Sequence, residues 1–288
     1  PTRATISGMN AASSPSQPVA LYDSGVGGLS VLRAAQAALP HERLLYFGDQ
    51  ANVPYGSRSL EELRAIAEAS TRFLLSQGAK LIVIACNTAS AAALKHLRAA
   101  FPDVPFVGME PAVKPAAEQS LTRKVGVLAT PSTFQGELYA SVVERFAQDV
   151  EIFQSTCPGL VSQIERARLN TPKTRRILEE AVLPMLDAGA DTLVMGCTHY
   201  PFVIPLIEKI AAGRARVIDP APAVARQTAR VLAERKLLNP SPEEGSLRFI
   251  TSGEPAAFEY ALARLLGLNA QAEAARWQGG ELKLIPRG

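Results

Sequence analysis

The chain has 288 residues, of which 47% are hydrophobic and 20% charged, and its formal net charge is +3. Such a composition is that of an ordinary globular protein, and this length favours two domains of roughly 150 residues each. The small charge, the lack of like-charge blocks and the lack of any apolar run near the roughly 18–20 residues of a membrane span argue against nucleic-acid and membrane binding.

The N-terminal end of the chain is small, polar and proline-containing, without the apolar segment of a signal peptide. We expect residues 1–18 to form a disordered tail. Within it, residues 1–8 are expected to be foreign to the natural protein and Met9 to be its natural start.

The first half of the chain alternates short apolar runs with segments of helical periodicity. Ser59 and Glu62 form a capping box at the start of one expected helix, and Gly78 follows its end. The run from Leu81 to Ala85 is apolar at every position, as in a parallel strand covered on both faces. Strands are expected at 19–23, 44–47, 81–85 and 104–107, and helices at 29–39, 60–77 and 89–100.

The second half repeats the order of the first. Strands are expected at 124–129, at 150–153, before Cys197 and at 216–218, with helices at 172–188 and 202–212. Cys86 and Cys197 lie 111 positions apart, as do Gly78 and Gly189 ahead of their strands. This duplication predicts an α/β protein of two pseudosymmetric domains, each a mostly parallel sheet flanked by helices, with the active site in the cleft between them.

The expected domains are interleaved in the chain. Residues 19–114 together with 223–288 would form the first domain, and residues 115–222 the second. Helix-like segments at 224–236 and 255–266 have no counterpart in the repeat, so we expect them to return to the first half.

Polar residues follow the expected strands in both halves. Ligands of open parallel sheets bind outside the carboxyl ends of the strands. Two facing domains would bring Cys86 and Cys197 toward one cleft. The residues placed at strand ends in this way are Asp23, Ser24, Asp49, Tyr55, Cys86, Asn87, Thr88, Thr130, Cys157, Cys197, Thr198 and His199.

A free cysteine is most often a small buried apolar residue, but matched positions in two halves favour chemistry. Cys86 and Cys197 each precede a helix N-terminus, which is expected to lower the thiol pKa. His199 beside Cys197 can hold a proton or stabilise a thiolate. Asp23 is the candidate helper in the first half, with a helix N-cap as the alternative. Cys157 is interpreted as structural, and the sparse, odd cysteine count favours a reducing cytoplasm without disulfides or structural zinc.

The glycine loop at 25–28 allows a rival interpretation. Gly25-Val26-Gly27 after a strand begins like a dinucleotide-binding loop. Ser30 occupies the third glycine position, however, and Asp23 would place a carboxylate where a pyrophosphate must lie. Nucleotide binding is therefore disfavoured.

Two thiols facing one cleft suggest proton transfer at carbon. One thiolate removes a proton from one face and one thiol returns a proton to the other, which inverts a stereocentre. Asn87, Thr88 and Thr198 can stabilise the carbanionic state. Acyl transfer by one thiol, with His199 as base, is the alternative. No pyridoxal-lysine arrangement stands out, so neither a cofactor nor a metal is expected.

Five motifs in this order resemble those of the glutamate racemases, in the aspartate/glutamate racemase superfamily. They lie at residues 21–32, 46–49, 53–56, 85–90 and 196–201. The resemblance implies cofactor-independent interconversion of L- and D-glutamate, supplying D-glutamate for peptidoglycan. It implies that Cys86 acts on the D-enantiomer and Cys197 on the L-enantiomer, assisted by Asp23 and His199. A family glutamate near the second cysteine best matches Glu165.

The resemblance also implies a set of substrate-binding residues and a homodimer, although no residue pattern determines the oligomeric state. Two departures stand out: Gln50-Ala51-Asn52 replaces the more usual threonine and basic residue, and Ser162 stands where proline is common. An aspartate or hydantoin racemase and a non-catalytic amino-acid-binding protein remain alternatives. The implied substrate contacts are Asp23, Ser24, Tyr55, Gly56, Asn87, Thr88, Thr130, Thr198 and His199.

Overall fold

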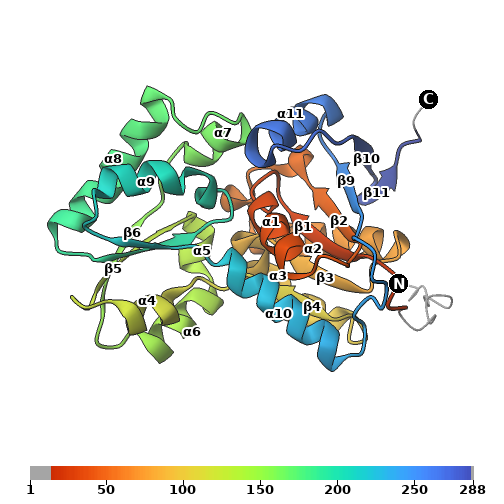
Figure 1. Cartoon of the computed structure of the whole chain (residues 1–288), viewed down its shortest axis with the longest axis horizontal. Helices are drawn as coiled ribbons and strands as arrows, with labels where there is room; N and C mark the ends of the chain where they lie inside the picture. The colour runs from red at the N-terminus through yellow and green to blue at the C-terminus, as the bar shows by residue number, and fades with distance from the viewer. Residues whose placement is uncertain (1–13, 287–288) are drawn as a thin grey trace.

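The computed structural model describes residues 14–286 (Figure 1). The expectations for residues 1–13, including a natural start at Met9, lie outside the described residues. Residues 14–18 differ from the disordered tail expected there. Lys80 donates hydrogen bonds from its backbone N–H to the carbonyl of Pro18 and from its ammonium group to that of Pro15, which holds this segment against the folded chain.

The strands form two sheets, which lie side by side in Figure 1 with helices around them. The first sheet has the order β11-β10-β9-β2-β1-β3-β4 and is parallel except for the β10–β11 hairpin. Its strands are β1 (Val19–Asp23), β2 (Leu44–Gly48), β3 (Leu81–Ile84), β4 (Phe106–Gly108), β9 (Leu247–Thr251), β10 (Ala272–Gln278) and β11 (Glu281–Leu284).

The second sheet is parallel throughout and has the order β6-β5-β7-β8. Its strands are β5 (Lys124–Ala129), β6 (Glu151–Ser155), β7 (Thr192–Gly196) and β8 (Arg216–Ile218). Strand β1 lies between β2 and β3, and β5 likewise lies between β6 and β7. Strand β4 follows β3 at one edge of the first sheet, and β8 follows β7 at one edge of the second. The duplication read from the sequence is thus a duplication of strand order, and it confirms the predicted α/β class.

Helices cover the faces of both sheets (Figure 1). The capping box of Ser59 and Glu62 forms as predicted. The third helix begins earlier than expected, directly after Cys86. The helices are α1 (Leu29–Ala38), α2 (Leu60–Ser76), α3 (Asn87–Ala100), α4 (Val113–Gln119), α5 (Pro131–Gln135), α6 (Glu137–Phe146), α7 (Leu160–Glu165), α8 (Pro172–Asp187), α9 (Ile204–Ala211), α10 (Ala221–Glu234) and α11 (Pro255–Leu266), with short 3-10 turns η1 (Gln50–Asn52), η2 (Tyr55–Ser57) and η3 (Tyr200–Val203).

The C-terminal segment contains three strands that the sequence pattern did not predict. Strand β9 pairs in parallel with β2, and β10 extends the sheet beyond it. Helix α10 packs along α1. The segment after residue 220 therefore adds to the first sheet. We propose domain boundaries after residues 114 and 222, so that the first domain comprises residues 19–114 and 223–288.

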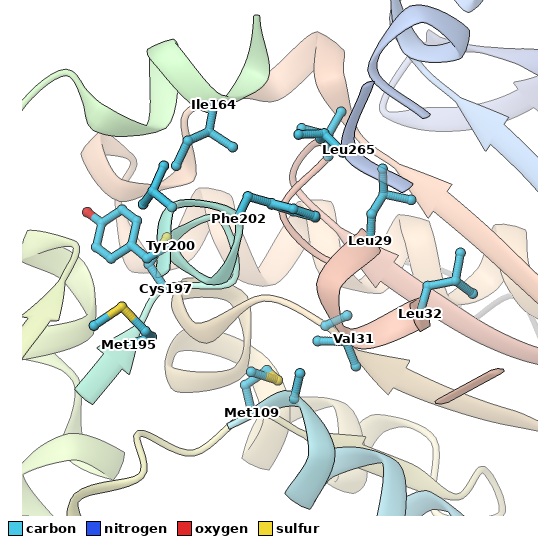
Figure 2. Close-up of a cluster of buried hydrophobic side chains, with 14 of the residues drawn as sticks. Leu29, Val31, Leu32, Met109, Ile164, Met195, Cys197, Tyr200, Phe202 and Leu265 are labelled. Atoms are coloured by element: carbon cyan, nitrogen blue, oxygen red, sulfur yellow. The ribbon is translucent and has the colours of Figure 1, made fainter. Parts of the chain in front are cut away.

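The two halves share one apolar core as well as a cleft. Figure 2 shows Phe202 of the second half extending toward Leu29 and Leu265 of the first, and all three belong to one continuous cluster of buried side chains. The Arg33 guanidinium lies 5.8 Å from the centre of the Phe202 ring. This contact brings together the segments that follow β1 and β7 in the chain, because Leu29 begins α1 and Phe202 lies in η3.

The described helices carry no sign of a membrane span: between residues 14 and 286, none is both long and apolar enough to cross a bilayer.

Candidate active site

A cavity of about 230 Å³ lies where the carboxyl ends of strands from both sheets meet. This volume is below the roughly 300–1,000 Å³ of sites for drug-sized ligands, so the cavity suits a small metabolite. Ten of the predicted site residues line it, among them both matched cysteines. They are Ser24, Tyr55, Gly56, Cys86, Asn87, Thr88, Thr130, Cys197, Thr198 and His199.

Cys86 lies at the end of β3 and is the N-cap of α3. Its sulfur accepts a hydrogen bond from the backbone N–H of Ala89 at 3.5 Å and lies 4.0 Å from Oγ of Ser24. Burial raises the pKa of the Cys86 thiol, and the negative charge of Asp23 raises it further. The Ala89 amide lowers the pKa by less. The sequence-based expectation of a lowered pKa is therefore wrong for Cys86, because desolvation of the thiolate exceeds the helix-end effect.

Cys197 belongs to a chain of three hydrogen-bonding groups. Its sulfur lies 3.7 Å from Nδ1 of His199, and Nε2 of His199 lies 2.5 Å from Oε1 of Glu165. Burial alone would lower the pKa of His199, but the hydrogen bonds to Cys197 and Glu165 and the charge of Glu165 raise it well above its ordinary value. Burial would raise the pKa of Glu165, and His199 reverses this, so that the carboxyl pKa is lowered. The pair therefore forms an imidazolium and a carboxylate.

The glycine loop of the first half gives space to this pair. A Cβ atom on Gly25 would lie 2.1 Å from Oε1 of Glu165, and one on Gly27 would lie 2.4 Å from Nδ1 of His199. No real Cβ contact is that close, so a side chain at either glycine would displace Glu165 or His199 from its present position. The loop that resembled a dinucleotide motif is thus a docking surface for Glu165 and His199.

Asp23 is fully buried and does not belong to the cavity lining among the described residues. It accepts hydrogen bonds from the backbone N–H of Gly25 and from Oγ1 of Thr198. Burial raises the pKa of the Asp23 carboxyl, and the charge of His199 offsets part of this rise. Asp23 acts on Cys86 through its charge and joins the two halves through Thr198. Glu165 likewise reaches the cavity only through His199.

Asn87 is the one predicted polar residue of the described lining whose side chain has no partner. It is buried at the start of α3, and neither its amide nitrogen nor its amide oxygen forms a hydrogen bond within the described protein. Buried polar groups are nearly always paired in native proteins. The Asn87 amide is therefore available to a ligand in the cavity that it lines.

Tyr55 is held in place from behind the cavity. Its hydroxyl donates to Oδ2 of Asp49 at 2.7 Å and lies 2.6 Å from the hydroxyl of Tyr22. Asp49 also accepts hydrogen bonds from Ser252 and from the indole N–H of Trp277. The C-terminal segment thus fixes the loop that forms one wall of the cavity, a link with no signal in the sequence.

Cys157 lies in the cavity wall, although its sequence context indicated only a structural role. Burial raises its pKa to about 12, so it is a neutral thiol. Its sulfur lies 3.8 Å from Oγ of Ser155. The more apolar part of the wall was not among the predicted site residues. It consists of Val53, Pro54, Ser57, Pro131, Thr156, Pro158, Gly159, Val161 and Tyr200.

Comparison with known proteins identifies the family. The sequence profile of the Asp/Glu/hydantoin racemases matches residues 29–228. The chain belongs to the Asp/Glu/hydantoin racemase family. Its enzyme class is therefore that of a racemase, an isomerase, as the motifs predicted.

Individual members of this racemase family resemble the chain over nearly its whole length. The glutamate racemase of Pseudomonas aeruginosa is 51% identical over 252 residues, which are 88% of this chain and 95% of that protein. A crystal structure of a glutamate racemase isoform from Bacillus anthracis has a TM-score of 0.80 at 30% identity, covering 90% of this chain and 97% of the other. That of Francisella tularensis glutamate racemase in complex with D-glutamate has a TM-score of 0.78 at 30% identity, covering 90% and 97%. These relatives confirm the predicted resemblance and the two-domain fold.

The unpartnered amide of Asn87 leads to a prediction with opposite effects on binding and stability. Asn87→Leu is expected to raise KM and lower kcat/KM for the substrate at least about tenfold, because a ligand hydrogen bond in the cavity is lost. The free energy of unfolding should be unchanged or rise by up to about 1 kcal/mol, since no internal hydrogen bond is broken. Steady-state kinetics and urea denaturation measure the two effects.

Asn239→Leu is the matched control. The Asn239 side chain donates to the carbonyl of His41 and accepts from the N–H of Ser241. Its replacement should reduce stability by about 1 kcal/mol and leave the kinetics unchanged. If Asn87→Leu instead lost stability and kept its KM, the assigned role of Asn87 would be refuted.

Proposed function

We propose that this racemase interconverts L- and D-glutamate by two-thiol proton transfer at the α-carbon, without a cofactor. The observation that carries the proposal is that Cys86 and Cys197, at equivalent strand ends of two like-ordered sheets, line one small cavity. Substrate and product are mirror images, so a nearly mirror-related pair of acid and base groups fits both.

In the direction from L- to D-glutamate, the thiolate of Cys197 takes the α-proton and becomes a thiol. The electron pair of the broken C–H bond stays on the substrate as a carbanion delocalised into the carboxyl group. The thiol of Cys86 then protonates the opposite face and becomes a thiolate. The reverse direction begins with a Cys86 thiolate and a Cys197 thiol, so the enzyme exchanges protons with water to return to its first state.

The two thiols start from different surroundings. Cys86 has a raised pKa, because of burial and the charge of Asp23, and is protonated at neutral pH. Cys197 faces the imidazolium of His199, which is the partner that a thiolate requires. His199 thereby places a positive charge beside Cys197, whereas Asp23 places a negative charge near Cys86. This supports the enantiomer assignments that the sequence resemblance implied.

The carbanionic state needs donors, because the α-proton of an amino acid is far less acidic than a thiol. The Asn87 amide is unpartnered, and the hydroxyls of Thr88 and Thr198 line the same cavity. Donors fixed in place before the reaction in a water-poor site stabilise developing charge at no cost of reorganisation. We assign these three residues, with Ser24, Tyr55, Gly56 and Thr130, to holding the substrate.

Glutamate is proposed as the substrate because the similar relatives are named glutamate racemases, one of them solved with D-glutamate. The motif at residues 53–56 supports it over aspartate or hydantoin racemases. A supply of D-glutamate to peptidoglycan synthesis, a cytoplasmic location and a homodimer belong to the same proposal, and gel filtration would test the last.

The direct experiment is incubation with L- or D-glutamate in deuterated water. Circular dichroism should fall to zero from either enantiomer, and the product enantiomer should carry deuterium at the α-carbon. Aspartate run in parallel should racemise far more slowly. Unchanged optical activity with glutamate would exclude the proposed reaction, and faster racemisation of aspartate would correct the substrate.

A further inference from the structure

The carboxylate of Glu165 is held by residues of both halves of the molecule. Oε1 accepts hydrogen bonds from Nε2 of His199 at 2.5 Å and from the backbone N–H of Val26 at 2.9 Å. Oε2 accepts a hydrogen bond from Nε2 of Gln50 at 3.1 Å. His199 follows the second sheet, whereas Val26 and Gln50 follow strands of the first. The full set of partners therefore exists only when the two halves are together.

Gln50 is itself held in one orientation. Its Oε1 accepts a hydrogen bond from the hydroxyl of Thr251 at 3.0 Å, and Thr251 is fully buried at the end of β9. A carboxylate can only accept hydrogen bonds, so the NH₂ group of Gln50 must face Glu165 and its oxygen must face Thr251. The returning C-terminal segment thereby orients a side chain that reaches the second half.

We propose that Gln50 is a positioning residue of the racemase reaction, which holds the Glu165–His199 pair in line with Cys197 in the closed molecule. The inference rests on the proposed function, because Cys197 must act as acid and base for its positioning to matter. Gln50 acts through Glu165 and is absent from the described cavity lining.

The charges around Glu165 set the direction of the expected effect. Three titratable groups interact with Glu165 through their charges, namely His199, Asp23 and Tyr46. Of the two first-half donors, only Gln50 is a side chain and can be replaced. Hydrogen bonds to an ionised carboxylate lower its pKa, and a second carboxylate nearby raises it. Removing the Gln50 N–H should therefore make Glu165 protonate at higher pH.

The test compares three variants over the pH profile of kcat/KM with glutamate. Gln50→Leu should lower kcat/KM about 10- to 100-fold, since a hydrogen bond to a charged group is lost. The loss should be equal in both directions because the two enantiomers have equal free energies. The acid limb of the kcat/KM profile should shift to higher pH, by about one unit in Gln50→Leu and by more in Gln50→Glu. Gln119→Leu, at an exposed glutamine on α4, should match the wild type.

The outcomes separate this inference from the function on which it rests. If the wild type does not racemise glutamate, the proposed function fails. If it does, and Gln50→Leu and Gln50→Glu keep the wild-type acid limb, the positioning role is overturned. Should Gln50→Leu fail to fold by circular dichroism, Thr251→Val decides instead. It keeps Gln50 but frees its orientation, and its acid limb should move in the same direction by a smaller amount.

Discussion

Cys86→Ser and Cys197→Ser are each expected to abolish measurable racemisation, with kcat falling at least about 100-fold and up to about 10,000-fold. Each thiol is the only proton carrier on its face of the cavity in the proposed reaction. A serine hydroxyl is far less acidic than a thiol and cannot form the base at neutral pH. Circular dichroism of L- and D-glutamate over time measures the loss.

The two variants should differ in what they retain. Any exchange of the α-hydrogen for deuterium in Cys86→Ser should be confined to L-glutamate, and in Cys197→Ser to D-glutamate, because one acid or base group remains on one face. Cys157→Ser replaces the third thiol, which has no step in the proposed reaction, and should continue to racemise. Near-normal turnover by either of the first two variants would rule out the two-thiol mechanism.

Glu165→Gln is expected to lower kcat/KM roughly 100-fold or more and to move the alkaline limb of its pH profile to lower pH. The carboxylate of Glu165 helps raise the pKa of the buried His199 well above its ordinary value. Without that charge the pKa of His199 falls, because burial opposes the imidazolium and the contact with Cys197 alone still favours it, so the imidazolium beside Cys197 is lost at lower pH. Steady-state rates across the pH range, for both enantiomers, measure the shift.

The same variant should lose stability in a defined pH range. The raised pKa of His199 contributes stability that is complete below its unfolded value of about 6.5 and is lost as pH rises through the folded value. The lowered pKa of Glu165 contributes stability above its unfolded value of about 4.3, lost as pH falls through the folded value. The deficit of Glu165→Gln should therefore be largest between about pH 4.3 and 6.5 and fade at alkaline pH.

Glu68→Gln provides the control for both effects. Oε1 of Glu68 lies 2.5 Å from Nε2 of His96, the same distance as between Glu165 and His199. Unlike that buried pair, both side chains are partly exposed. Such a surface pair contributes at most about 1 kcal/mol. Glu68→Gln should thus change neither the pH profile nor the kinetics. An equal response of the two variants would show that the His199–Glu165 pair has no part in the reaction.

Much of the fold follows from local pattern. Strands such as Leu81–Ile84 are short apolar runs, and helices such as α2 have a matching periodicity and end signals, so these elements were predicted to within a few residues. Helices α4 to α7 were not predicted. The strands after residue 246 were not, because β9 is defined by its pairing with β2, some 200 positions earlier in the chain. Pairing between distant segments leaves little local signal.

The sequence by itself also indicated the proposed chemistry: two cysteines at matched positions, with His199 beside one of them, favoured proton transfer at a substrate carbon by two thiols. Only the tertiary structure decided how those groups are charged and held. Burial, which depends on everything packed around Cys86, raises the pKa that a helix end was expected to lower. In the first half, the partners of Glu165 are Val26 and Gln50, residues more than 100 positions away. Solvation and contacts across the two halves belong to the folded molecule, and no window of sequence contains them.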